Sequence, residues 1–220
     1  MLNKFFREPV NTLTHLFGAL LAVAGTVFMI YDSLDKSTYI PLMASLFFGI
    51  SMILLYTSSA VYHWVDARYP DALLWLKKID HMMIYVLIAG TYTPYALIGL
   101  ESPKSWIVFY SVWGIALAGI ILKLVWIHAP RWLSTLFYLG MGWMSLAIFP
   151  LMSEGFSIMG FVWLGIGGFF YTVGAIIYAI KKPDPFPKVF GFHEIWHLFV
   201  IGGTFSHFWS IYNYVIPMAV

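Results

Sequence analysis

Two histidines spaced four residues apart are the residues of this sequence best suited to chemistry. They frame the segment His193-Glu194-Ile195-Trp196-His197. Residues four apart lie on one face of a helix, so both imidazoles can bind the same divalent metal ion. The segment also matches the His-Glu-x-x-His pattern of zinc peptidases, in which the glutamate is the general base. Glu194 has a second interpretation, because a carboxylate at a helix start is stabilised by the helix dipole.

His63 supplies a third imidazole for the same site. Three histidines leave one position of a tetrahedral zinc ion open, which is typical of catalytic zinc. Ser59 lies one turn before His63, where its hydroxyl either orients a bound water or hydrogen-bonds to its own helix. Asp80 is expected to start a helix, where it is an N-cap, a base beside the metal or a ligand that binds the metal through water. We predict a zinc site of His63, His193 and His197, with Asp80 and Ser59 as catalytic partners.

The remaining histidines receive no ligand role from the sequence. His81 points at least a quarter-turn away from Asp80, so it stays outside the predicted ligand set. His15, His128 and His207 are interpreted as structural, because polar residues in a membrane bundle normally face its interior and find partners there. The chain contains no cysteine, which excludes disulfides and thiolate ligands.

The elements that must position these residues are membrane helices. Hydrophobic residues make up 61% of the 220-residue chain and charged residues only 10%, too few to cover a soluble domain. A membrane-spanning helix needs about 20 mostly apolar residues. Seven stretches qualify, so we predict one all-α domain, residues 1–220, that forms a seven-helix bundle. The expected spans are 12–31, 41–64, 79–100, 105–126, 132–151, 158–180 and 193–215.

The distribution of positive charge predicts the orientation of this bundle. With seven spans, the side that holds the N-terminus carries ten of the twelve Lys and Arg residues, and the other side carries only Lys36 and Lys104. The positive-inside rule therefore predicts a cytoplasmic N-terminus, an outer C-terminus and a multi-pass protein of the cell membrane. It also places six of the seven histidines near the inner leaflet. Because the cations are scattered over loops, we expect membrane lipids as partners and no nucleic acid.

Five short motifs are spread over nearly the whole chain. They are Asn11-x3-His15-x2-Gly18, Ser59-x3-His63, Asp80, the segment Gly90 to Pro94, and His193-x3-His197. Together they resemble the signature of the hemolysin III family, which belongs to the progestin and adipoQ receptor superfamily. That superfamily is more distantly similar to alkaline ceramidases.

The resemblance carries specific expectations about the site. It implies a seven-helix bundle that binds zinc near the cytoplasmic face, with His63, His193 and His197 as ligands. Asp80 and Ser59 would hold or orient the water at the zinc. The resemblance also argues against Glu194 as a general base, because receptors of the superfamily need not carry glutamate between the paired histidines.

Three functions follow from these observations. The first is a zinc-dependent intramembrane hydrolase that acts on a lipid amide or ester, favoured by the open three-histidine site and the ceramidase likeness. The second is a non-enzymatic sensor or regulator of membrane state, with zinc as a structural clamp. The third is the cytolytic activity that the family name records. The sequence argues against a simple pore, because no expected span has a polar stripe along its length.

Overall fold

The structure is built from helices. The computed structural model describes residues 6–126, 130–152, 155–187 and 189–219. Within these ranges there is no strand, only an isolated bridge between Phe186 and Phe190. The all-helical prediction is confirmed. The helices are α1 (Pro9–Leu34), α2 (Ile40–Trp64), α3 (Pro70–Leu97), α4 (Lys104–Val125), α5 (Arg131–Trp143), α6 (Ser145–Ile148), η2 (Phe149–Leu151), α7 (Ile158–Ile180), α8 (Phe192–Ser210), η3 (Ile211–Val215) and η4 (Ile216–Met218).

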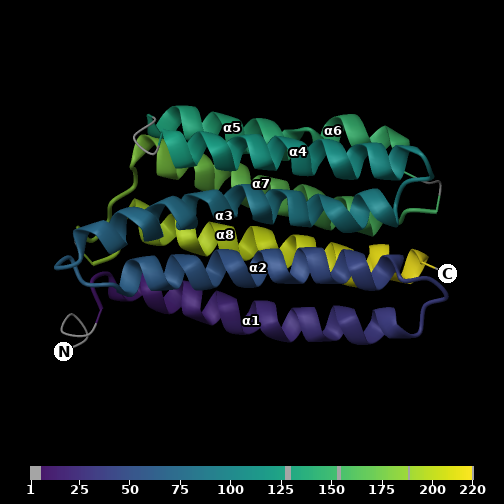
Figure 1. Ribbon diagram of the computed structural model, residues 1–220, viewed down its shortest axis with the longest axis horizontal. Coiled ribbons are helices and arrows are strands. Elements are labelled where there is room, and N and C mark those ends of the chain that lie inside the picture. Colours follow the sequence, from purple (N-terminus) through teal and green to yellow (C-terminus); the bar gives the residue numbers. More distant parts are fainter. Residues whose placement is uncertain (1–5, 127–129, 153–154, 188, 220) are drawn as a thin grey trace.

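The long helices lie side by side along one axis and form a single bundle (Figure 1). Helix α1 packs along α2, α2 along α3 and α3 along α4, while α8 packs on α7 and on α1. The last helix therefore returns to the first. Helix α1 begins at one end of the bundle and α8 begins at that same end, running towards the C-terminus at the other (Figure 1). We call the end where α1 and α8 begin the histidine end.

The bundle has the surface of a membrane protein. Within the described ranges, five segments are long and apolar enough to cross a membrane: Pro9–Leu34, Ile40–Trp64, Lys104–Val125, Trp132–Leu151 and Ile158–Ile180. Large apolar side chains such as Leu20 and Phe169 are exposed on the outside of the bundle, where lipid can cover them. These features are those of a multi-pass membrane protein. Helices α3 and α8 run alongside the five, but each carries several ionisable residues near the histidine end.

Helix α3 differs from the expected third span. It begins at Pro70, nine residues before the expected start at Ile79. Proline suits the first turn of a helix, and Asp71 beside it interacts favourably with the helix dipole. The charges of Lys77 and Lys78 interrupt the hydropathy pattern without interrupting the helix. Asp80 consequently lies in the helix interior, and its interpretation as an N-cap is wrong.

The expected fifth and seventh spans are also not continuous α-helices. Helix α5 ends at Trp143, and a short α6 and the 3-10 turn η2 continue to Leu151. Pro150 lacks the amide hydrogen that a continuing helix requires, which explains the change of helix type there. Helix α8 ends at Ser210, and the last expected residues form the π-helical turn η3.

Close packing of α3 on α2 depends on Gly90. A Cβ atom at this position would clash with the side chain of Ser51 and lie 3.1 Å from the backbone oxygen of Phe47. Small residues at such positions let helix backbones approach in a membrane. Gly90 thus fixes the spacing between the helix that carries His63 and the helix that carries Asp80.

Candidate metal centre

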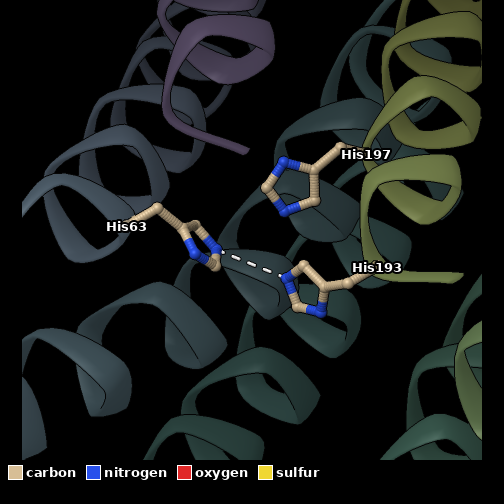
Figure 2. Close-up of side chains that lie close together, drawn as sticks. All are labelled: His63, His193 and His197. Atoms are coloured by element: carbon tan, nitrogen blue, oxygen red, sulfur yellow. Dashed lines mark hydrogen bonds between the residues drawn. The ribbon is translucent and has the colours of Figure 1, made fainter. Parts of the chain in front are cut away.

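Three histidines converge at the histidine end of the bundle. His63 lies in the last turn of α2, and His193 and His197 lie one turn apart at the start of α8. Their rings face one another across the gap between the two helices (Figure 2). Each residue offers one ligand atom, and these atoms all lie within 4.8 Å of one another. The prediction that these three histidines come together is confirmed.

The spacing of two of the donor atoms suits zinc. Nε2 of His63 and Nε2 of His193 are 3.3 Å apart (Figure 2). In a tetrahedral site with Zn–N bonds of about 2.0–2.1 Å, neighbouring nitrogens are about 3.4 Å apart. The ring centroids of His193 and His197 are 4.8 Å apart. The imidazole of His197 therefore lies next to the same candidate metal position. Three imidazoles and no thiolate form a donor set that zinc accepts readily.

Glu8 fixes the orientation of His63. Its Oε2 atom lies 2.6 Å from Nδ1 of His63. An ionised carboxylate only accepts hydrogen bonds, so Nδ1 carries the proton and donates it, which leaves the lone pair of Nε2 free for a metal. Burial raises the pKa of Glu8, but the hydrogen bond from His63 and the Arg7 guanidinium outweigh it and lower that pKa below its ordinary value. Glu8 is therefore ionised at neutral pH.

Asn11 connects this carboxylate to the start of α8. Its amide nitrogen donates to Oε2 of Glu8 at 3.0 Å and to Oε1 of Glu194 at 2.9 Å. Oε2 of Glu194 accepts the backbone N–H of Gly191, the residue before α8. Glu194 thus holds the first turn of the helix that bears two of the histidines. This geometry matches its interpretation as a carboxylate at a helix start.

Helix α1 also contacts His197. Oγ1 of Thr14 lies 3.4 Å from Nδ1 of His197, so the opposite ring nitrogen is the one available to a metal. The ring of His15 stacks on the ring of His197, with centroids 3.6 Å apart and planes 14° apart. Neither nitrogen of His15 has a hydrogen-bond partner among the described residues, although the side chain is buried. His15 therefore packs directly against the histidine cluster.

Asp80 and Ser59 line the same cavity as the three histidines. This cavity has a volume of about 440 Å³. Ser59 is buried, and Asp80 is partly buried, with its Oδ2 atom 3.3 Å from Nδ1 of His81. His81 also contacts the carbonyl oxygen of Lys77 through Nδ1, at 2.8 Å. His81 is therefore engaged by its own helix and stands apart from the cluster.

The other two histidines are not part of the cluster. His207 is buried on α8, with its ring edge-on to that of Tyr171 at 5.4 Å between centroids. Neither of its nitrogens has a partner among the described residues. His128 lies outside the described residues.

An apolar cavity adjoins the polar one. It has a volume of about 220 Å³ and extends between α3, α5, α7 and α8. Six residues line both cavities, and they mark the boundary between them: Leu55, Ile84, Tyr138, Ala175, Trp196 and Val200. The histidine cluster therefore lies in a polar cavity that shares a boundary with an apolar one.

Sequence reasoning missed Glu8 as a partner of the site, since the residue lies outside the expected first span. A signal was nevertheless present. Glu8, Asn11 and His15 are spaced by three and four residues, which places them on one face of a helix that is otherwise apolar. A polar stripe of this kind at the start of a membrane helix must meet polar groups on its neighbours.

Comparison with known proteins identifies the family. A family model described as "Haemolysin-III related" matches residues 3–208. The chain belongs to the hemolysin III family. It is 36% identical to Hemolysin-3 of Bacillus cereus over 219 residues, which cover 99% of this chain and 96% of that protein. It is 39% identical to the Hemolysin-3 homolog of Bacillus subtilis (strain 168) over 212 residues, 96% of this chain and 95% of the relative.

More distant relatives extend beyond bacteria. The adiponectin receptor protein of Drosophila melanogaster is 26% identical over 225 residues, which cover 93% of this chain and 50% of that protein. The resemblance to the progestin and adipoQ receptor superfamily is confirmed. The matched residues of this hemolysin III protein include all three histidines of the cluster together with Glu8, Ser59 and Asp80.

Proposed function

We propose that this hemolysin III protein is a zinc-dependent hydrolase that cleaves an amide or ester bond of a membrane lipid. One observation carries the proposal: the polar cavity that holds the histidine cluster adjoins an apolar cavity. A lipid has the same division, with a polar linkage next to an apolar chain. A bound lipid would present its amide or ester to the histidines and extend its chain into the apolar cavity.

Zinc held by His63, His193 and His197 would polarise the carbonyl and lower the pKa of a coordinated water. The chain's own residues then have distinct tasks. The carboxylate of Asp80 accepts a proton from the attacking water and returns it to the leaving group. The hydroxyl of Ser59 orients that water from the turn of α2 that precedes His63. Glu8 keeps the proton of His63 on Nδ1.

The orientation predicted from charge fits this function. Seven spans with a cytoplasmic N-terminus would place the histidine end at the inner leaflet. The substrate would then enter sideways from that leaflet, and no water-filled path across the bilayer is required.

A direct test is hydrolysis by purified protein in nanodiscs, with a panel of ceramides and glycerophospholipids. We expect release of a fatty acid that depends on added zinc and disappears in the presence of a chelator. The His63→Ala variant should be inactive, whereas Asp66→Asn, which alters an exposed carboxylate at the same end of the bundle, should retain activity. Zinc-loaded wild-type protein without any product from the whole panel would refute the hydrolase.

A second function is supported by the placement of the ligands on different helices. His63 belongs to α2 and the other two histidines belong to α8, which packs mainly on α7 and α1. Zinc would then act as a clamp between α2 and α8 in a non-enzymatic regulator of membrane state. In that case a chelator would lower the melting temperature strongly while the lipid panel stayed unchanged. Product formation with little change in stability would instead support the hydrolase.

A further inference from the structure

The polar cavity contains a second group of charged residues besides the histidine cluster. Lys77 of α3, Lys123 of α4 and Ser134 of α5 line it together with the histidines. These three residues come from helices that contribute no histidine to the cluster. They form what we call the lysine lobe of the cavity.

Lys123 is buried in a way that is unusual for a lysine at a membrane helix end. Such lysines normally extend towards water or lipid head groups. Lys123 lies in the last turn of α4, yet only 2% of the residue is exposed. Its Nζ atom donates a hydrogen bond to Oγ of Ser134, which is also buried. The ammonium group therefore points into the bundle.

Lys78 shows how an ordinary lysine behaves at this level of the bundle. Its Nζ atom donates to the carbonyl oxygen of Leu124 at 3.1 Å and lies 4.7 Å from the ring centre of Trp75. It does not line the cavity. Lys78 thus binds a carbonyl group at the end of α4 and contacts an interfacial aromatic ring. Lys123 points into the cavity instead, so capping of a helix end does not explain its position.

The carboxylates that line the cavity have charged or polar partners, whereas its lysines have no carboxylate partner within the described part of the chain. Its two carboxylates each contact a histidine: Glu8 contacts His63 at 2.6 Å and Asp80 contacts His81 at 3.3 Å. Among the residues that the structure describes, no carboxylate lies within ion-pair distance of Lys77 or Lys123. A buried ammonium group without a counter-charge is costly. The lysine lobe therefore has a surplus of positive charge and a cavity that can admit an anion.

We propose that the lysine lobe binds a phosphate group. Two ammonium groups and a hydroxyl match the several oxygens and the double negative charge of a phosphomonoester. The phosphate belongs either to the head group of an anionic lipid or to free inorganic phosphate. This assignment goes beyond the proposed hydrolysis and does not depend on a metal, since the lysine lobe shares no residue with the histidine cluster.

Binding to purified full-length protein in phosphatidylcholine nanodiscs tests the proposal. The probes are inorganic phosphate and dioctanoyl phosphatidate, with dioctanoylglycerol as the probe that lacks phosphate, and calorimetry gives the affinities. We expect phosphatidate to bind and dioctanoylglycerol to bind much more weakly. The Lys123→Met and Lys77→Met variants should each bind about tenfold to a hundredfold more weakly, the effect of losing one charged hydrogen bond.

Matched variants separate a binding role from a structural one. Lys78→Met removes one positive charge from the same helix as Lys77 and should bind within about twofold of wild type. Lys123→Arg keeps the charge and should retain binding. If Lys123→Met does not fold, Lys77→Met decides, because Lys77 is only half-buried.

The outcomes distinguish the two sources of phosphate. Binding of phosphatidate alone assigns the lobe to a lipid head group, and binding of both probes assigns it to phosphate itself. Failure of the wild-type protein to bind either probe would overturn the proposal. Equal affinity in wild type and in a folded Lys77→Met or Lys123→Met variant would overturn it as well. None of these outcomes depends on whether the protein hydrolyses lipids.

Discussion

Glu8 and His63 are 55 residues apart in the sequence and 2.6 Å apart in the structure. The residue just before the first helix thereby sets the proton position of a histidine in the last turn of the second. Carboxylates in this position raise the basicity of a metal-binding imidazole and hold its ring in place. The start of α1 is consequently part of the candidate metal centre.

Replacement of Glu8 by glutamine should weaken metal binding. Loss of a carboxylate behind a histidine ligand typically lowers metal affinity by about 10- to 100-fold. Competition with a fluorescent zinc chelator measures this affinity in detergent-purified protein. Glu101→Gln serves as the control, because Glu101 is exposed at the opposite end of the bundle. Unchanged affinity in Glu8→Gln would show that the carboxylate does not support the site.

Metal content should depend on both helices that carry the cluster. We expect about one zinc per chain in wild-type protein, measured by inductively coupled plasma mass spectrometry after gel filtration. His63→Ala and His193→Ala should each lose it, since two remaining imidazoles bind zinc weakly. His81→Ala should keep it, because His81 contacts its own helix. Wild-type protein that stays free of metal after incubation with zinc would contradict the assignment.

Asp80→Asn should separate catalysis from metal binding. If Asp80 is the base, its loss should lower the hydrolysis rate by about 10²- to 10⁴-fold while the zinc content stays the same. Asp66→Asn is a matched control, because Asp66 is an exposed carboxylate at the same end of the bundle. A variant that loses zinc and activity together would instead make Asp80 part of metal binding.

Gly90→Ala should destabilise the bundle. The added methyl group meets Ser51 and the backbone of Phe47, and overpacking of this kind costs about 1–3 kcal/mol. Gly114→Ala adds the same methyl group to α4 where no atom lies within 4 Å, and we expect unchanged or slightly increased stability. Thermal unfolding in detergent compares the two variants. Equal melting temperatures would mean that α3 and α2 can separate without loss of stability.

Hydropathy predicted the helices best where turn residues bound an apolar run. The expected span 158–180 has the same bounds as α7, and the expected span 41–64 differs from α2 by one residue. The pattern failed at α3, because a helix continues through charged residues that a hydropathy window excludes. It also treated the broken fifth helix as continuous, since apolarity alone does not distinguish α-helical from 3-10 backbone.

The candidate site was predictable where spacing within one helix decides the geometry. The interval between His193 and His197 is sufficient to place both rings on one face of α8. The approach of His63 to this pair followed from the predicted topology, which places the end of the second span and the start of the seventh on the same side of the membrane. The contacts made by Glu8 and His15 depend instead on the rotation of α1 against α2 and α8. A single sequence contains no direct measure of that rotation.

The cluster joins two histidines, His63 and His193, that are 130 residues apart, and this separation imposes an order on biosynthesis. At a synthesis rate of about 5–20 residues per second, His63 waits roughly 6 to 26 s before His193 is made. Through that interval the charged start of α1 and the end of α2 must remain at the membrane surface or associate with each other. A metal ion that needs all three imidazoles can enter only after the last helix has inserted. Metal loading at this candidate site would therefore report that all the helices from α1 to α8 have been assembled in the membrane.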